Sequence, residues 1–414
     1  MGLILSLDNS IHSFNTGKFV LDQYTGAAAG YSLRRLSVNT TNVVRVRRSS
    51  DNAEADFTAA EVADGTLENW VNTDVLKYES DFTSGNSDLS EVNGIGTDGE
   101  TIDGVSDAYK FTLSGGSVNH FTRVLGKINA TNTFNISFDF YIPSSNSAVD
   151  GIQMYLLSGA PVYNTLDSWT SVTLTNVTSS SDQLRFYAVD GTNLTIDADG
   201  DVFYLKNIVV TQTTADGHVT TWYDQAGSND ATQATAAEQP KIVDAGVLVE
   251  ENGKPAVQFD GTHLMEVFSP DVRVGGYLEL AVAASNSTTP STFAGLISHA
   301  GTLVQSVQGY LGVRSSGTSW GTFDATNRVF GSTTGSQQII HRYNDGTNNI
   351  QTNKVDNIVG DVYNTTNAIR IGIIGHFTST SGQYIGTAQE ILLWGNQDGS
   401  LIESGVYNNV SSYY

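Results

Sequence analysis

The sequence contains no cysteine and little positive charge. Without thiols the chain has no disulfide framework, no cysteine nucleophile and no thiolate metal site. Its 20 basic residues stand against 43 acidic residues, which gives a formal net charge of −23. Because such a surface repels phosphate groups, we expect neither nucleic acid nor an anionic membrane as a partner.

Long hydrophobic runs are also missing. The apolar stretch from Leu3 to Leu7 is too short to span a membrane and lacks the basic start of a secretory signal. It is typical of a first strand, or it belongs to an anchoring arm formed by residues 1–20. A protein of extracellular composition without a signal fits a phage virion protein, which leaves the cell by lysis.

Strand patterns dominate what is present. Apolar and polar residues alternate in Phe134–Phe140, Leu184–Val189 and Val202–Val210, which predicts strands with one buried face each. The 41 glycines and the many Asn, Asp and Ser residues between such runs favour turns. We expect an all-β fold with two short helices, in Thr25–Leu36 and Phe57–Trp70. A length of 414 residues suits two domains.

An acidic segment interrupts the chain between residues 65 and 216. Two similar turns bracket it, Ala63-Asp64-Gly65 and Ala215-Asp216-Gly217, as expected for an insertion into a surface loop. The segment has the size of one independent β-sandwich. We therefore predict a first domain in two parts, residues 1–64 and 217–414, and an inserted domain at residues 65–216.

Two blocks on either side of this segment carry a family resemblance. Arg45–Asp51 and Thr221–Gln233 resemble the start of the catalytic sandwich of fungal α-L-arabinofuranosidase B, and more closely the concanavalin A-like, laminin G-like domains of bacteriophage structural proteins. In those proteins only a few tens of residues separate the two blocks. The parts that resemble the opening, middle and last strands of the same domain are Leu21–Leu36, Glu238–Ile242 with Asn252–Gly261, and Gln389–Trp394 with the terminal Tyr413–Tyr414.

The inserted segment resembles a carbohydrate-binding jelly roll. Its closing run, Phe203–Ile208, contains the Leu-Lys-Asn-Ile strand that is typical of such modules. The two resemblances together imply a concanavalin A-like β-sandwich that is interrupted by a second, jelly-roll β-sandwich. Fold alone does not fix function, so the candidate sites are considered separately.

Sugar binding requires exposed aromatic rings with polar partners, because sugars present apolar faces and hydroxyl rims. The inserted segment offers aromatic residues that fit this role and equally fit a core, together with two polar partners. The candidates are Tyr155, Tyr163, Trp169 and Tyr187, with Gln153 and Arg185. A structural calcium ion is the expected cofactor candidate, at Asp197, Asp199 and Asp201, where a solvated acidic turn is the alternative.

Evidence for catalysis is weak. A glycosidase needs two carboxylates across a cleft, and no Glu-x-Asp-x-x-Glu pattern occurs. Glu390 stands alone in a late strand, and the nucleophile-bearing block of arabinofuranosidase B has no counterpart, so we predict no enzyme activity. The basic cluster is either an anion clamp or a set of strand arginines that pair with Asp51, Asp56 or Asp224. Its members are Arg34, Arg35, Arg45, Arg47 and Arg48.

The sequence therefore favours a non-enzymatic virion surface protein: a capsid decoration protein, a head fibre or a tail-associated adhesin. Host or environmental glycans and other virion proteins are the expected partners, and a homo-oligomer is expected because weak sugar contacts gain from multivalency. Two alternatives remain open. One is a secreted polysaccharide hydrolase or lyase with an appended binding module, and the other is a purely architectural virion protein.

Overall fold

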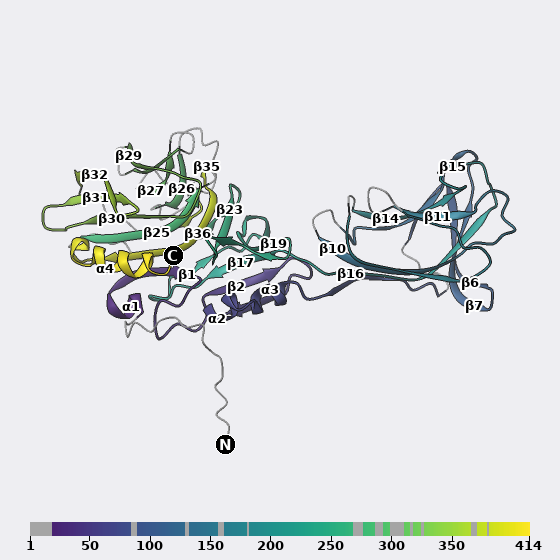
Figure 1. Cartoon of the computed structure of the whole chain (residues 1–414), viewed down its shortest axis with the longest axis horizontal. Coiled ribbons are helices and arrows are strands. Elements are labelled where there is room, and N and C mark those ends of the chain that lie inside the picture. The colour runs from purple at the N-terminus through teal and green to yellow at the C-terminus, as the bar shows by residue number, and fades with distance from the viewer. Residues whose placement is uncertain are drawn as a thin grey trace, which may run out of the picture. The chain divides into compact units, whose positions relative to one another are not determined.

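The computed structural model describes residues 19–83, 89–128, 132–155, 161–179, 182–267, 276–285, 293–298, 310–314, 318–323, 327–365, 371–378 and 381–414. The strand expected at Leu3–Leu7 lies outside these residues. The chain is nearly all β and divides into two compact units (Figure 1). The host unit comprises Met1–Arg48, Asn52–Glu68 and Gly217–Tyr414, and the insert unit comprises Ser49–Asp51 and Asn69–Asp216.

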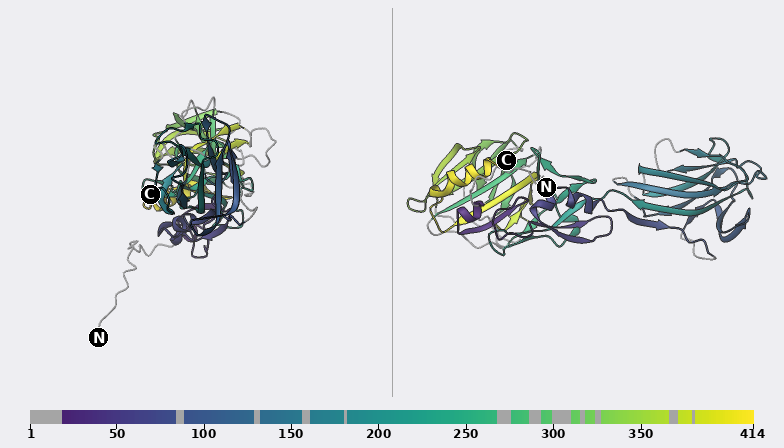
Figure 2. Two further views of the ribbon diagram at one scale, coloured as in Figure 1. Left: turned by 90° about the vertical axis from the view of Figure 1, so that its right-hand side faces the viewer. Right: turned by 60° about the horizontal axis from the view of Figure 1, so that its bottom comes forward.

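The host unit is built around one long antiparallel strand, β36 (Ile385–Gly395). It pairs with β1 (Ala27–Ser32), β23 (Val257–Asp260) and β25 (Tyr277–Ser285). Nearly all of its side chains are buried, because it runs through the middle of the sheet. Helix α4 (Gly399–Ser411) packs on this sheet against β25 and β30 (Figure 2).

The two blocks that carry the family resemblance form neighbouring strands. Strand β2 (Val44–Arg48) pairs with β17 (Gly217–Trp222) in an antiparallel register, with Val44 opposite Trp222. The chain leaves the host unit within helix α3, after β2, β3 and α2, and returns at β17. The division falls between Glu68 and Asn69 at one end and between Asp216 and Gly217 at the other.

The remaining elements of the host unit are short strands and helices. They are α1 Val20–Gln23, β3 Glu54–Phe57, α2 Ala59–Ala63, α3 Thr66–Val71 (which ends in the insert unit), β18 Ala231–Thr232, η1 Ala236–Glu238, β19 Lys241–Asp244, β20 Val247–Leu248, β21 Glu250–Glu251, β22 Lys254–Pro255, β24 Met265–Glu266, β26 Phe293–Ser298, β27 Tyr310–Arg314, β28 Ser319–Phe323, β29 Asn327–Ser332, β30 Gln338–Asn344, β31 Ile350–Val355, β32 Ile358–Asn364, β33 Ile373–Ile374, β34 His376–Thr378 and β35 Ser381–Gln383.

The helix predictions had mixed outcomes. The helical expectation for Phe57–Trp70 is confirmed by α2 and α3, and Thr58 and Glu61 form a capping box at the start of α2. The helix expected in Thr25–Leu36 is wrong. Its alanine run forms β1, because pairing with β36 and burial of that strand outweigh the helix propensity of alanine.

The end of the chain is helical as well. Tyr413 and Tyr414, which resembled part of a last strand, follow helix α4 instead. Asp398 caps this helix by accepting a hydrogen bond from the backbone N–H of Ser400 at 2.9 Å. None of the helices in the described residues has the length and hydropathy needed to cross a bilayer.

The insert unit is a sandwich of two antiparallel sheets (Figure 1). The sheets have six and five strands, and a phenylalanine-rich core lies between them. The strands expected in Phe134–Phe140, Leu184–Val189 and Val202–Val210 are confirmed as β10, β14 and β16. The six-stranded sheet has the order β13-β10-β16-β7-β6 with β4 beside β16, and the five-stranded sheet has the order β12-β11-β14-β9-β5.

The strand bounds in this unit are β4 Val75–Glu79, β5 Ser90–Val92, β6 Gly94–Ile102, β7 Val105–Leu113, β8 Val118–Asn119, β9 Phe121–Leu125, β10 Thr133–Tyr141, β11 Gly151–Tyr155, β12 Val162–Tyr163, β13 Thr170–Thr178, β14 Gln183–Val189, β15 Thr195–Ile196 and β16 Val202–Gln212.

Candidate functional site

The face of the five-stranded sheet that points away from the core is where aromatic and polar side chains gather. Alternation along β11 buries Ile152 and Met154 in the core and leaves Gln153 and Tyr155 on the opposite side. Tyr155 is 39% exposed. We call this side of the sheet the outer face.

Strand register places further side chains beside these two. Gln153 lies opposite Tyr187 of β14, which in turn lies opposite Phe121 of β9. In the next row Tyr155 lies opposite Arg185 of β14. The outer face therefore carries one row of an amide and two aromatic rings and a second row that begins with a tyrosine and an arginine.

The aromatic rings form a continuous cluster. The ring centroids of Phe121 and Tyr187 are 4.5 Å apart with an interplanar angle of 38°. Tyr155 meets Tyr187 edge-on, with centroids 6.1 Å apart and an angle of 74°. Such contacts fix the rings in place, and an exposed ring held in this way can stack against the apolar face of a sugar with little loss of side-chain entropy.

Arg185 is held inside this cluster. Its guanidinium carbon lies 5.6 Å from the Phe121 ring centroid and 5.7 Å from the Tyr155 ring centroid. Its Nε donates to Gln183 Oε1 at 2.9 Å, and its Nη1 donates to the Tyr187 hydroxyl at 3.3 Å. The guanidinium plane is thus fixed and can present its remaining N–H groups to a hydroxyl or an anion.

The structure brings four of the six predicted sugar-binding residues together and separates two. Tyr163 of β12 is half-buried and packs against the core, where its ring centroid lies 5.6 Å from that of Phe138 and 5.8 Å from that of Phe140. Trp169 lies on the other side of the sandwich, next to Tyr141, and donates its Nε1–H to the carbonyl of Ile102. The positions of Tyr163 and Trp169 depend on which strands pair in the two sheets, and this pairing cannot be read from the sequence.

Three residues of the outer face were missed by sequence reasoning: Phe121, Arg123 and Gln183. The alternation of Phe121 and Arg123 with the buried Thr122 and Val124 was the available signal. It indicates a two-sided strand, but it gives no indication that β9 lies next to β14. That proximity comes from the sheet order alone.

The acidic turn predicted to bind calcium has a different arrangement of carboxylates. Asp201 accepts backbone hydrogen bonds from Ser147, Ala148 and Val149 at 2.7–2.9 Å. Burial raises the pKa of Asp201, but these bonds lower it more, so its pKa lies below its ordinary value. Asp197 and Asp199 are exposed.

Within the described residues no group of three or more His, Asp or Glu side chains is arranged to hold a metal ion. One oxygen of Asp199 accepts the backbone N–H of Gly116 at 2.9 Å, and both oxygens of Asp201 are engaged by the loop at residues 147–149. Through these hydrogen bonds the acidic turn at residues 197–201 fixes the neighbouring loops. The calcium site stays a prediction.

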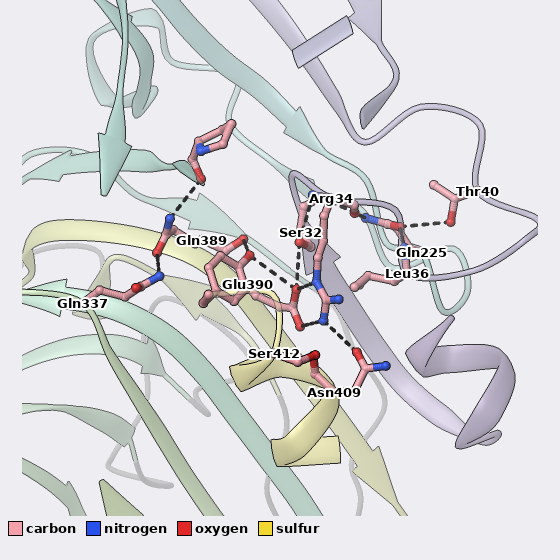
Figure 3. A network of polar contacts seen from close by, with 12 residues as sticks. Ser32, Arg34, Leu36, Thr40, Gln225, Gln337, Gln389, Glu390, Asn409 and Ser412 are labelled. Carbon is pink, nitrogen blue, oxygen red and sulfur yellow. Dashed lines mark hydrogen bonds and ion pairs between the residues drawn. The ribbon is translucent and has the colours of Figure 1, made fainter. Parts of the chain in front are cut away.

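In the host unit the arginine cluster is divided among separate partners. Arg34 forms a bidentate ion pair with Glu390, from Nε at 2.6 Å and Nη2 at 2.9 Å (Figure 3). Arg45 pairs with Asp56 at 2.7 Å, as the structural interpretation expected. Arg47 instead donates to Gln239 at 2.8 Å. The shared anion clamp considered from the sequence is not formed by these three residues.

Glu390 is fully buried and also accepts a hydrogen bond from the Ser32 hydroxyl at 3.0 Å (Figure 3). A carboxylate that is enclosed and saturated in this way cannot reach a substrate. The nearby Trp222–Gln225 block is structural too, because Trp222 is fully buried and Asp224 accepts the backbone N–H groups of Gly30, Ala226 and Asn229 at 2.8–3.1 Å.

A polar hollow of about 710 Å³ lies beside this block in the host unit and is lined in part by Asp22, Tyr223 and Asp230. Its carboxylates hold loops: Asp22 accepts from the Ser37 hydroxyl at 2.7 Å, and Asp230 accepts the backbone N–H of Asp224 at 2.9 Å. The hollow lacks the clustered aromatic rings of the outer face, so it is the weaker candidate for a sugar site.

No protein-family model matches the sequence, and no curated protein matches it. Among solved structures, a mutant of a family 29 carbohydrate-binding module is 14% identical, with a TM-score of 0.24, over 34% of this chain and 92% of that chain. A GH54 α-L-arabinofuranosidase is 14% identical, with a TM-score of 0.37, over 69% of this chain and 63% of that chain. A Trypanosoma rangeli sialidase is 12% identical, with a TM-score of 0.32, over 78% and 53%.

These structural neighbours are carbohydrate-binding and carbohydrate-cleaving proteins, and none of the three is described as a phage protein. At these TM-scores the likeness carries no argument about function. The proposal that follows rests on the geometry of the outer face.

Proposed function

We propose that this chain is a glycan-binding protein whose binding surface is the outer face of the insert unit. The observation that carries the proposal is the fixed cluster of Tyr155, Tyr187 and Phe121, with side-chain amides and guanidinium groups at its edge. The Tyr155 and Phe121 rings, which are at least partly exposed, suit the apolar faces of sugar rings, and the buried Tyr187 ring holds them in place. The surrounding N–H and C=O groups suit the sugar hydroxyls.

The same face supports binding rather than hydrolysis. Strands β9, β11, β12 and β14 contain no Asp or Glu residue. Glu91 of the edge strand β5 accepts a hydrogen bond from Tyr109 at 3.0 Å. Glycoside hydrolysis requires a pair of carboxylates about 5–10 Å apart across the sugar, and these four strands supply none.

In the host unit, two carboxylates in long strands are also unsuited to act as the acid or base of glycoside hydrolysis. Glu390 is buried against Arg34, and Glu279 of β25 is buried against Arg342, with an Nε–Oε2 distance of 2.6 Å. Both carboxylates are fully enclosed, so neither can protonate or attack a glycosidic oxygen without a large rearrangement.

The experiment is a glycan array followed by titration of the bound glycan into the full chain and three variants. Tyr155→Ala and Phe121→Ala should each weaken binding at least tenfold, which corresponds to about 1.4 kcal/mol. Trp169→Ala removes an aromatic ring from the other side of the sandwich and is the matched control, with affinity expected to stay unchanged. Loss of binding in the control but not in Tyr155→Ala would place the site elsewhere and refute the proposal.

We further propose, as the sequence resemblance implies, that the protein works on a virion surface alongside other virion proteins. We also propose that it is a homo-oligomer, because weak sugar contacts gain from multivalency. Mass spectrometry of purified particles tests this location. Release of reducing sugar from arabinan or an algal polysaccharide would instead support the hydrolase alternative. Absence of binding, even for an oligomeric form, would support the architectural one.

A further inference from the structure

Two arginines face each other on the outer face. Arg123 of β9 lies directly opposite Arg185 of β14. Arg123 Nη1 donates to Gln183 Oε1 at 3.0 Å, and Arg185 Nε donates to the same oxygen at 2.9 Å. Because both nitrogens bond one oxygen, the two cationic groups lie within about 6 Å of each other, close enough for substantial repulsion.

The part of the insert unit that the structure describes supplies no carboxylate for this pair. Within the described residues neither Arg123 nor Arg185 forms an ion pair, although the chain is strongly acidic. Other arginines behave differently, and four in the host unit have a carboxylate partner. They are Arg34 with Glu390, Arg45 with Asp56, Arg328 with Asp361, and Arg342 with Glu279.

The placement is also selective. Arg123 and Arg185 are the only arginines between residues 69 and 216, and both stand on the same sheet face as the exposed Tyr155. Like charges directly opposite each other on neighbouring strands destabilise a sheet, and a neutral amide neutralises neither of them. In this arrangement folding leaves a positive site that an external anion would satisfy.

We infer that the glycan bound at the outer face is an acidic polysaccharide, whose carboxylate or sulfate group binds between Arg123 and Arg185 while a sugar ring stacks on Tyr155. This inference rests on the proposed function and adds the class of ligand. Guanidinium groups suit both anions because their N–H groups form paired hydrogen bonds with carboxylate and sulfate oxygens.

The acidic remainder of the chain does not prevent this binding. At physiological ionic strength the screening length is about 8 Å, so the repulsion between the ligand and distant acidic residues is largely screened. The half-buried arginine pair interacts with the anion at contact distance, where screening is weak. Affinity should therefore hold or rise as salt is raised from about 0.01 M to 0.15 M. A general basic surface shows a steep fall over that range.

The test is calorimetric titration of the full chain with oligogalacturonate, with the same oligosaccharide after reduction of its carboxyl groups, and with a sulfated galactan of matched length. Oligogalacturonate binding with a loss of at least tenfold on carboxyl reduction identifies a uronate ligand. Tighter binding of the sulfated chain identifies a sulfate ester as the source of the anion.

Arg123→Gln and Arg185→Gln should each weaken binding of the acidic chain at least tenfold. Lys110→Gln removes the same charge from β7 in the other sheet and is the matched control, with affinity expected to stay within twofold. Because each arginine variant also removes a cross-strand repulsion, its thermal midpoint should equal or exceed that of the parent, which separates lost binding from lost folding.

Equal affinity for the acidic and carboxyl-reduced chains, with binding still lost in Tyr155→Ala, would overturn the inference and leave the proposed function intact. A lower thermal midpoint in both arginine variants would overturn it as well, because the pair would then be stabilising the fold. Failure of every glycan to bind would overturn the proposed function and this inference together.

Discussion

The buried pair of Arg34 and Glu390 allows a quantitative prediction about the host unit. The Glu390 side chain is fully buried and that of Arg34 is 13% exposed, and two charge-assisted hydrogen bonds join them. Replacing Arg34 with leucine leaves an enclosed carboxylate with only its weaker hydroxyl partners. Removing one partner of such a pair costs about 3–5 kcal/mol, so we expect a loss of that size in the free energy of unfolding.

Urea unfolding followed by tryptophan fluorescence measures this loss in the correct unit, because Trp222, Trp320 and Trp394 are all buried in the host unit. With an m-value of about 2–3 kcal/mol per molar urea, the midpoint should fall by about 1–2.5 M. The control is Arg45→Leu, which breaks an exposed pair in the same unit and should cost about 0–1 kcal/mol.

The double variant Arg34→Leu with Glu390→Met completes the cycle. It removes both charges from the core, so most of the stability lost in the single variant should return. Two results would refute the reasoning: a cost for Arg34→Leu no larger than that for Arg45→Leu, or a double variant whose loss equals the sum of the two single losses.

Three further predictions concern stability. Tyr163→Ala should destabilise the insert unit by about 3 kcal/mol in urea unfolding followed by circular dichroism, because its ring packs in the core, and a neutral effect would contradict that placement. Asp201→Asn should cost about 1–3 kcal/mol in the same assay, since the amide cannot accept all three backbone hydrogen bonds, and unchanged stability would argue for a loose turn. Burial lowers the pKa of His341 below its ordinary value of 6.5. Burial raises the pKa of Glu403, but the hydrogen bond between Glu403 and His341 helps to bring the pKa of Glu403 below its ordinary value of 4.5. The unfolded state then binds more protons, so the thermal midpoint should fall as the pH drops through 6.5 and again below 4.5, and a midpoint that rises on acidification would show the opposite linkage.

Several parts of the fold could be predicted from local sequence. The alternation in Phe134–Phe140 specified β10 and its core-facing side, because a strand with period-two hydrophobicity has only one face to bury. The start of helix α2 follows from a local capping box at Thr58 and Glu61. By contrast, the alanines of β1 have high helix propensity, and only their pairing with the distant β36 made them a strand.

The candidate site shows the same division more sharply. From the sequence Tyr155 and Tyr163 were equally good candidates, yet Tyr155 lies on the outer face and Tyr163 packs against the core. The alternation of residues along a strand shows that neighbouring side chains point to opposite faces of the sheet. Which of the two faces is the outer one depends on where the second sheet of the sandwich packs. Sequence reasoning could therefore name both tyrosines but could not separate them.

By itself the sequence determined the all-β character, the acidic surface and the presence of aromatic and arginine side chains in the inserted segment. These follow from composition and from periods of two residues, which are local properties. Only the tertiary structure decided that Arg123 stands opposite Arg185 beside Tyr155, and that Arg34 meets Glu390 in the core. Such neighbours come from strand pairing between distant segments, and their energies depend on burial, which local patterns do not encode.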